Sequence, residues 1–247
     1  MCHSDTSSPP QAADTVPAAS ATELTLRAED GVDLLAFEAR PAIPSGVGVV
    51  VLPDVRGLHQ FYKDLAVRFA EIGAEAVAID YFARSADTPD RSERFDYQPH
   101  VQQTTSEGVA RDVQAAVAQL RARGARTVFT VGFCFGGAYS WRQSADTPGL
   151  AGVIGFYGKP ARAAGASDRM TAPLLMLLAG DDANIPVSEV ESLAARARAA
   201  GAPAEMHVFE GAPHSFFDRT AAEHAEHSAR AWLLLRNFID AHSPLPR

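Results

Sequence analysis

Side chains that could together carry out acyl transfer lie far apart in this sequence. Cys134 stands in a Gly-x-Cys-x-Gly-Gly pattern within TVFTVGFCFGGAYSW, after a run rich in β-branched and aromatic residues. His214 stands in EGAPHSFF, and Asp181 and Asp182 follow the apolar run APLLMLLAG. A thiol can act as nucleophile, an imidazole as general base, and a carboxylate can orient the imidazole and hold its tautomer. Spacing alone does not choose between Asp181 and Asp182.

The glycines around Cys134 indicate a sharp turn from a strand into a helix, in which Gly132 and Gly136 leave room for neighbouring elements. A Gly-x-nucleophile-x-Gly turn of this kind is the nucleophile elbow of the α/β-hydrolase fold. The start of the helix would favour a thiolate over a thiol. We expect the backbone N–H groups of Phe135 and Val55 to hold an oxyanion. The alternative is that Cys134 is a buried apolar residue in a turn.

The remaining histidines have positions that favour other roles. His224 and His227 lie among glutamates on the predicted last helix. His207 lies inside a predicted strand, and His59 and His100 lie near predicted helix starts. His214 instead follows the last predicted strand in a loop of small residues, which favours it as the base.

The elements that must position these side chains alternate between strands and helices. A hairpin is predicted over 23–41, with Asp30 and Gly31 at its turn. Further strands are predicted at 46–54, 74–82, 126–133, 151–158, 172–180 and 203–211. Helices are predicted at 61–73, after Cys134, and at 107–124, 187–201 and 221–240. One long irregular stretch, 85–103, is left, which is typical of a functional or mobile loop.

This order predicts a single-domain α/β fold with a mostly parallel sheet of about eight strands and helices on both faces. We place the domain at 22–247, after a flexible tail at 1–21. Ligands of such sheets bind outside the carboxyl ends of the strands. Cys134, the carboxylate pair and His214 each follow a different predicted strand, in the order nucleophile, acid, base.

Composition limits the classes of partner. The net charge of −8 over 247 residues argues against nucleic acid or an anionic membrane surface as the main partner. Two cysteines cannot form a disulfide framework, and the first twenty residues lack the pattern of a signal peptide, so we expect a cytoplasmic protein. No zinc-ligand spacing is present, and we expect neither a metal nor a cofactor.

The chain resembles the dienelactone hydrolase family of the α/β-hydrolase superfamily. Three segments carry the resemblance, GFCFGG, GDDANIP and EGAPHSFFDR, and two more support it, PDVRGL and AIDYFARSA. The resemblance runs from about Thr22 to Phe238. It implies hydrolysis of a small carboxylic ester or lactone, anionic ones included, through an acyl-enzyme on Cys134, with Asp182 as the acid and His214 as the base.

The resemblance also implies residues that tune the thiol and hold the substrate. Asp54 corresponds to a carboxylate that contacts the resting thiol, and Arg84 to an arginine that binds the substrate carboxylate. A plain turn residue is the alternative for Asp54, and a surface salt bridge is the alternative for Arg84.

The sequence departs from the family at a second substrate-binding arginine, four residues after the histidine, where it carries Asp218. Arg219 or Arg56 could supply a cation instead, and this departure puts dienelactone itself in doubt as substrate. Tyr157 and Phe217 are candidates for the pocket wall, although most large aromatic residues belong to the core. Two other functions stay open, an esterase or thioesterase of broader scope and a non-catalytic relative that binds a small ligand. The sequence does not name the ester or the oligomeric state.

Overall fold

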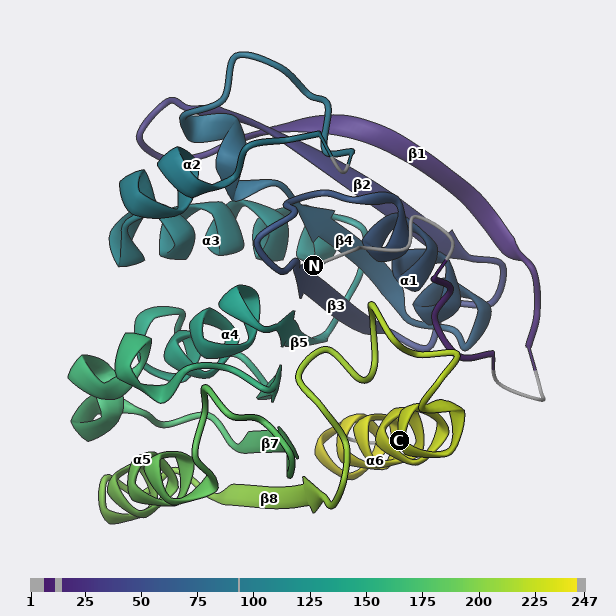
Figure 1. Cartoon of the computed structure of the whole chain (residues 1–247). Helices are drawn as coiled ribbons and strands as arrows, with labels where there is room; N and C mark the ends of the chain where they lie inside the picture. Colours follow the sequence, from purple (N-terminus) through teal and green to yellow (C-terminus); the bar gives the residue numbers. More distant parts are fainter. Residues whose placement is uncertain (1–6, 12–14, 93, 244–247) are drawn as a thin grey trace. The chain divides into compact units, whose positions relative to one another are not determined.

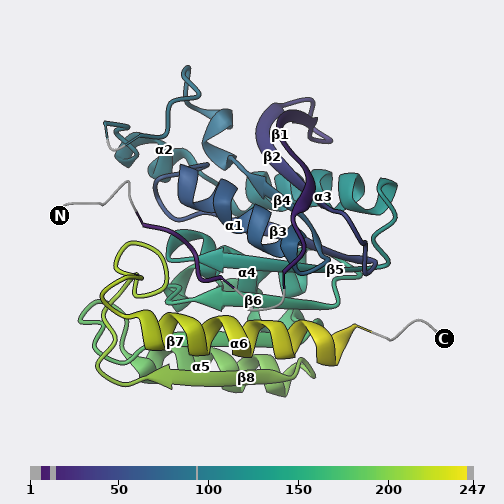
Figure 2. The same cartoon turned by 90° about the vertical axis from the view of Figure 1, so that its right-hand side faces the viewer.

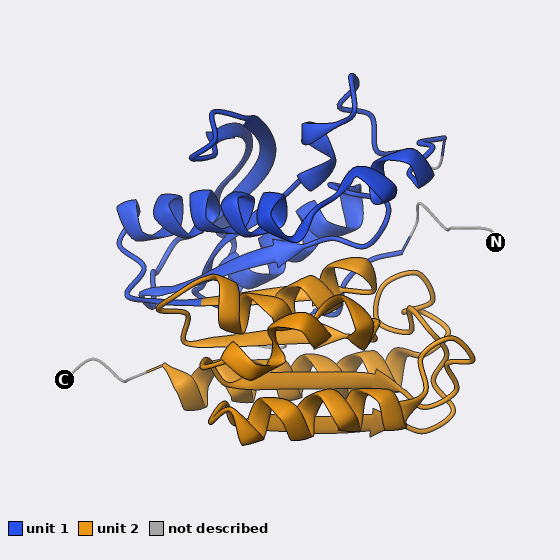
Figure 3. Cartoon of the chain, turned by 90° about the vertical axis from the view of Figure 1, so that its left-hand side faces the viewer, with its two compact units in different colours: residues 1–128 blue, residues 129–247 orange. Residues whose placement is uncertain are grey.

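A computed structural model of the chain describes residues 7–11, 15–92 and 94–243. The chain divides into two compact units, Met1–Val128 and Phe129–Arg247, which Figure 3 colours separately. Each unit contains strands of a sheet with helices packed against them, and each is described by itself below.

The first unit contains four strands in the order β1-β2-β4-β3. β1 and β2 are antiparallel, as are β2 and β4, whereas β3 and β4 are parallel. The bounds are β1 Ala18–Arg27, β2 Asp33–Pro41, β3 Val47–Leu52, β4 Glu75–Ile79, α1 Gln60–Glu71, η1 Tyr81–Arg84, α2 Gln98–Gln103 and α3 Ser106–Ala122. Helices α1 and α3 lie on opposite faces of β3 and β4 (Figure 1).

The predicted hairpin is confirmed as β1 and β2. Gly31 adopts a φ of 84°, a left-handed conformation that glycine tolerates, and its N–H donates to the carbonyl of Ala28 at 2.9 Å. β1 begins at Ala18, before the domain start predicted at residue 22, so the last residues of the predicted tail form part of a strand. Residues 1–6 and 12–14 of that tail lie outside the described residues.

The segment 85–103 is more ordered than expected, because helix α2 occupies its last residues. Arg91, which is buried, pairs with the buried Asp80 at 2.8 Å, and its guanidinium lies 4.3 Å from the ring centroid of Phe95. Phe95 in turn stacks on His100 at 5.0 Å. A buried charge without a partner is costly, so this ion pair anchors the segment to the end of β4.

The second unit holds strands β5 to β8 in sequential order, all parallel. The bounds are β5 Thr127–Phe133, β6 Gly152–Phe156, β7 Leu174–Ala179, β8 Ala204–Phe209, α4 Phe135–Asp146, η2 Pro160–Arg162, η3 Ala164–Arg169, α5 Val187–Ala199 and α6 Ala225–His242. Helices α4 and α5 lie on one face of these strands and α6 on the other (Figures 1 and 2).

The central strands β6 and β7 of the second unit are buried on both faces, as the continuous hydrophobic runs predict. Every residue of β6 and β7 is buried. Among the described residues the structure contains all eight predicted strands. None of the described helices is both long enough and apolar enough to cross a membrane.

Candidate active site

Cys134 lies between the end of β5 and the start of α4, in a strained backbone conformation with φ 52° and ψ −108°. A left-handed conformation costs a residue other than glycine on the order of 1–2 kcal/mol, so surrounding contacts must hold it. The N–H of Cys134 donates to the carbonyl of Phe156 on β6 at 3.0 Å, and its carbonyl accepts from the N–H of Gly137 at 3.1 Å. The turn therefore presents the thiol at the carboxyl end of β5.

The glycines of this turn are required by close backbone contacts. A Cβ atom on Gly132 would overlap the carbonyl oxygen of Gly136, and one on Gly137 would overlap the carbonyl oxygen of Phe156. The steric reason for glycine at position 132 is thus confirmed, and the elbow is a tight turn of the kind that the sequence predicts.

His214 lies in the loop after β8, and its Nδ1 is 2.6 Å from Oδ2 of Asp182, in the loop after β7. The Asp182 side chain is only 1% exposed, and its Oδ1 accepts from the N–H of Asn184 at 3.0 Å. Asp181 is exposed, and its N–H donates to the carbonyl of Ala212 at 3.0 Å. The structure therefore brings Asp182, and not Asp181, against the imidazole.

The electrostatics of this pair favour a protonated imidazole. Burial is the largest single influence on His214 and lowers its pKa, but hydrogen bonds to Asp182 and to the sulfur of Cys134 together raise the pKa to about 10. Burial raises the pKa of Asp182, and the hydrogen bonds from His214 and Asn184 outweigh it, so that this pKa lies below its usual value. With Nδ1 directed at Asp182, Nε2 is the nitrogen that is left for Cys134.

Backbone hydrogen bonds join the loop that contains Asp182 to the end of β8 and the loop that contains His214. The N–H of Gly180 donates to the carbonyl of Phe209 at 2.9 Å, next to the bond between Asp181 and Ala212. After the histidine, Ser215 adopts a φ of 65°, and its carbonyl accepts from the N–H groups of Asp218 and Thr220, both at 3.2 Å. These bonds fix the position of His214 relative to Asp182.

Tyr157 and Phe217, both expected in a pocket wall, are almost fully buried. The Tyr157 ring lies 5.0 Å from the His214 ring, so it packs directly against the base. Phe217 packs on Phe156 at 4.6 Å and on Phe133 at 5.5 Å, and no part of it is exposed. Phe217 thus packs among aromatic rings of the core, and its role in a substrate pocket stays a prediction, as does that of Tyr157.

In the first unit, Asp54 and Arg56 form a buried ion pair in the turn after β3. Nε of Arg56 lies 3.0 Å from Oδ2 of Asp54, and the N–H of Arg56 donates to Oδ1 at 2.8 Å. This arrangement holds the turn that contains Val55, which is partly exposed. The contact of Asp54 with the thiol and the role of Val55 as an oxyanion donor stay predictions.

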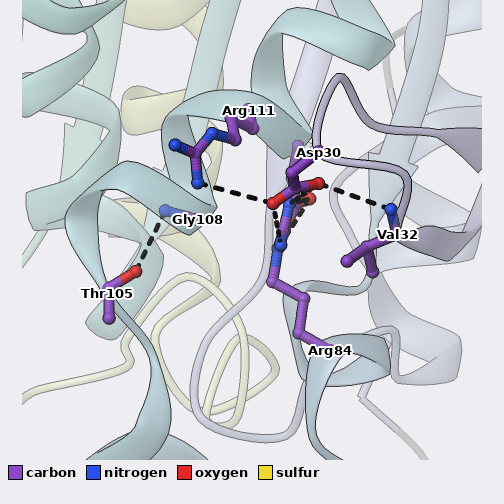
Figure 4. A network of polar contacts seen from close by, with 7 residues as sticks. Asp30, Val32, Arg84, Thr105, Gly108 and Arg111 are labelled. Atoms are coloured by element: carbon purple, nitrogen blue, oxygen red, sulfur yellow. Dashed lines mark hydrogen bonds and ion pairs between the residues drawn. The ribbon is translucent and has the colours of Figure 1, made fainter.

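Arg84 is engaged by carboxylates of its own unit. Its Nε lies 3.0 Å from both carboxylate oxygens of Asp112, and its Nη1 lies 2.7 Å from Oδ2 of Asp30. Oδ2 of Asp30 also forms an ion pair with Nη1 of Arg111 at 3.4 Å (Figure 4). Arg84 therefore forms the salt bridges of the alternative interpretation, and its binding of a substrate carboxylate stays a prediction.

Two further charged residues of the second unit, Asp218 and Arg162, have contacts that the structure shows. Asp218, which occupies the position of the family's second arginine, is fully buried. Its Oδ1 accepts from the backbone N–H of Arg219 at 2.6 Å. The sequence reasoning missed Arg162, whose guanidinium lies 4.6 Å from the centroid of the Phe135 ring. It lies in the loop after β6, where the rule on strand ends would have found it.

The competing histidines have local contacts elsewhere. Nδ1 of His59 accepts from the N–H of Phe61 at the start of α1. Nε2 of His207 lies 2.6 Å from Oε1 of Glu205, and Nδ1 of His100 lies 2.9 Å from the hydroxyl oxygen of Ser85. Of the described histidines with hydrogen bonds to a carboxylate, only His214 also contacts a cysteine.

A strand-to-helix elbow that carries a thiol, followed by a carboxylate and an imidazole in the loops after later strands, is an arrangement typical of the α/β-hydrolase fold. The family model of the Dienelactone hydrolase family matches residues 34–243. The chain belongs to the dienelactone hydrolase family and is a hydrolase of carboxylic esters or lactones.

Similar proteins agree with this assignment. A protein of Methylorubrum extorquens named "Putative carboxymethylenebutenolidase" is 29% identical over 245 residues, which cover 89% of this chain and 80% of the relative. A Bradyrhizobium protein named "Probable 2-oxo-3-(5-oxofuran-2-ylidene)propanoate lactonase" is 29% identical and covers 76% of this chain and 81% of its own length. The crystal structure of "Putative Dienelactone Hydrolase" from Klebsiella pneumoniae has a TM-score of 0.79 and 27% identity, covering 90% of this chain and 98% of the other.

Proposed function

We propose that the chain hydrolyses a lactone that bears a carboxylate, through a thioester on Cys134. The observation that carries this proposal is the contact of one imidazole, that of His214, with the Cys134 sulfur and with the buried carboxylate of Asp182. The strained turn at Cys134 supports it independently, because strain of this kind persists where the surrounding structure maintains a functional geometry.

In the first step, the sulfur of Cys134 attacks the carbonyl carbon of the lactone, and a C–S bond forms. The N–H of Phe135, the first residue of α4, is our candidate donor to the oxyanion, with the positive end of the helix behind it. The tetrahedral intermediate then collapses, the ring C–O bond breaks, and His214 donates its proton to the leaving oxygen. The product of this step is an open-chain acyl group on Cys134.

In the second step, His214 accepts a proton from water, and the oxygen of that water attacks the thioester carbonyl. The C–S bond breaks, the acyl group leaves as a carboxylic acid, and the sulfur returns as a thiolate beside the imidazolium. Asp182 holds the Nδ1 proton throughout and stabilises the imidazolium. Each catalytic group therefore ends in its starting state.

The relatives support the proposed substrate class. The name of the Bradyrhizobium relative describes a furanone ring with a propanoate group, which is a lactone that carries a carboxylate. We extend that class to this chain as part of the proposal. A broader-scope esterase or thioesterase is the nearest alternative, and a panel of carboxylate-bearing lactones, aryl esters and acyl thioesters separates the two.

The test compares the wild type with Cys134→Ala on this panel. We expect Cys134→Ala to lose turnover of both lactone and activated ester by at least about a thousandfold while the far-UV circular dichroism stays unchanged. A Cys2→Ser variant is the matched control, because it removes the chain's other thiol and should keep full activity.

Mass spectrometry adds a second readout. With an activated ester, the Cys2→Ser protein should gain one acyl group on Cys134, and iodoacetamide should block that gain. Retained turnover in Cys134→Ala would remove the thiol from the mechanism. Failure of the wild type to hydrolyse any member of the panel would favour the non-catalytic, ligand-binding alternative.

A further inference from the structure

Strand β1 forms an edge of the sheet in the first unit. It pairs with β2 on one side, and among the described strands none pairs with its outer edge (Figure 1). With 10 residues, β1 is longer than a typical strand of about 5–6 residues. An edge of this length presents backbone donors and acceptors to which another strand can bind.

The backbone contacts of the neighbouring strand show which residues face the open edge. Thr25 lies opposite Leu35 of β2, and the carbonyl of Leu35 accepts from the N–H of Asp80 at 2.9 Å, on the side of β2 that faces away from β1. Two residues that lie opposite each other in an antiparallel pair point their backbone groups either toward each other or away from each other. Thr25 therefore directs its N–H and C=O to the open edge, and so do Glu23 and Arg27, two residues to either side.

This edge has little of the protection that edge strands usually carry. The sequence of β1, AASATELTLR, contains no proline and no lysine, and its charged residues are Glu23 and Arg27. The register is irregular between Ala18 and Ser20, which disturbs the first residues of the strand and leaves the rest regular. Residues 21–27 are therefore open to pairing.

The side chains along this edge are self-complementary about Thr25. When two copies of β1 pair antiparallel with Thr25 opposite Thr25, Glu23 of each copy faces Arg27 of the other. On the other face of the strand, Leu24 of each copy faces Leu26 of the other, and this contact would cover Leu24, which is only partly buried. Cross-strand pairs of opposite charge and pairs of apolar side chains both stabilise a sheet.

A shift of the pairing by two residues removes this match. In one direction, Glu23 would face Thr25 of the second copy and Arg27 would face Ala21, so no ion pair forms. In the other direction, Glu23 would face Glu29, and like charges directly opposite each other are destabilising. The charges therefore select the register that is centred on Thr25.

Ion pairs within each copy fit the same register. Glu23 pairs with Lys63 of α1, and Nη1 of Arg27 lies 2.7 Å from Oδ1 of Asp33. The side chains of Glu23 and Arg27 are 70% and 66% exposed, so both remain accessible to a second copy. Across the proposed interface the charges then alternate in sign from Lys63 to Glu23, and on to Arg27 and Asp33 of the second copy.

We propose that the chain forms a homodimer in which the β1 strands of two copies pair antiparallel about Thr25. A two-fold axis brings the same surface of both copies together, so that surface must be complementary to itself. The charges of β1 meet this requirement, which favours a second copy over an unrelated strand. The inference does not rest on the proposed function, because β1 contains none of the candidate catalytic residues.

Sedimentation velocity between about 1 and 500 µM protein tests the proposed dimer. Because the paired edge is small, we expect a dissociation constant on the order of 10 µM. Thr25→Pro removes the N–H that faces the open edge and should abolish the dimer. It should leave the hairpin folded, because proline is tolerated where the N–H of an edge strand faces solvent.

Two charge variants test the register. Arg27→Glu places a carboxylate opposite Glu23 of the second copy, and Glu23→Arg places a guanidinium opposite Arg27; each should weaken the dimer by about tenfold or more. An equimolar mixture of the two variants should recover the dimer, because every charge at the edge then faces its opposite. Arg94→Glu makes the same change of charge at an exposed position outside β1, so it should keep the dissociation constant within about twofold.

The possible outcomes separate clearly. A wild type that stays monomeric over this range overturns the inference, as does a dimer that persists in both Thr25→Pro and Arg27→Glu, because another surface then forms it. If circular dichroism shows that Thr25→Pro is unfolded, the mixture of the two charge variants decides, and failure of that mixture to dimerise overturns the inference. The proposed hydrolysis by Cys134 stands or falls separately.

Discussion

Replacing Asp182 by asparagine removes one negative charge from the candidate site and keeps the shape of the side chain. The amide oxygen can still accept from the N–H of Asn184. The amide nitrogen, however, can only donate, so it favours the imidazole of His214 with Nδ1 unprotonated. This is the wrong tautomer for a base that must use Nε2.

The structure gives a scale for the loss. At about 1.4 kcal/mol for each pKa unit, the rise in the pKa of His214 from 6.5 to about 10 corresponds to roughly 5 kcal/mol in favour of the imidazolium. The hydrogen bond to Asp182 is the largest of the influences that raise this pKa, so the loss of the carboxylate charge should remove a large part of that stabilisation. The wrong tautomer adds to this, and we expect kcat/KM to fall by between about a hundredfold and ten-thousandfold.

Steady-state hydrolysis of 4-nitrophenyl butyrate at pH 7 measures the loss, with Asp181→Asn as the matched control. Asp181 is exposed and uses its backbone, not its carboxylate, to bind Ala212, so its variant should keep activity within about twofold. NMR titration of the His214 ring should also show a lower pKa in Asp182→Asn. A loss at Asp181 equal to or larger than that at Asp182 would refute the assignment of the acid.

The same pair makes stability depend on pH in a defined direction. The pKa of His214 is higher in the folded protein than the ordinary 6.5, so the stabilisation by the ion pair is complete below pH 6.5 and is lost as the pH rises toward 10. The pKa of Asp182 is lowered, so the pair also weakens as the pH falls below the ordinary value of that carboxyl, 3.8. The melting temperatures of wild type and Asp182→Asn should therefore differ most near pH 5–6 and converge by about pH 10.

Two further variants test the elements that position the site. In urea unfolding, Gly132→Ala should lower the free energy of unfolding by about 3 kcal/mol, because the new Cβ would overlap a backbone carbonyl. Gly165→Ala is the control, because no atom lies within 4 Å of a Cβ at that position, and it should change the free energy of unfolding by less than about 0.5 kcal/mol. Arg91→Met should lower the free energy of unfolding by about 3–5 kcal/mol, because it leaves Asp80 buried without its partner. Arg94→Met, at an exposed position, is the control and should not lower the free energy of unfolding. Equal effects of the two variants would contradict the anchoring role of Arg91.

Much of the fold could be predicted from the sequence because several of its strands are buried on both faces and are separated by clear stop signals. The runs that became β3, β6 and β7 are continuous apolar segments, and the structure buries nearly all of their residues. The elbow was also predictable, since Gly132 and its neighbours have a steric role that depends only on local geometry. The start of β1 was not, because Ala18 and the residues after it are polar or small and exposed.

Side-chain partners that are distant in the sequence were harder to predict. Arg84 pairs with Asp30 and Asp112, which are 54 and 28 residues away, and nothing in the local pattern marks either carboxylate. Burial of Phe217 among other aromatic rings depends on the packing of β5 and β6 against the loop after β8. Local reasoning could not choose between Asp181 and Asp182, and only the family pattern favoured the carboxylate that lies against His214.

Backbone strain gives an argument for this site that does not depend on the chemistry of its side chains. Among the described residues, those other than glycine with a positive φ are Cys134, Tyr157 and Ser215. They follow β5, β6 and β8, and bonds to neighbouring strands or loops hold each of them. One is the proposed nucleophile, one packs on the proposed base, and one follows that base directly in the chain. Strain that served only the fold would have no reason to gather at these three positions, whereas a site that must hold a thiol and an imidazole in a fixed geometry gives such a reason.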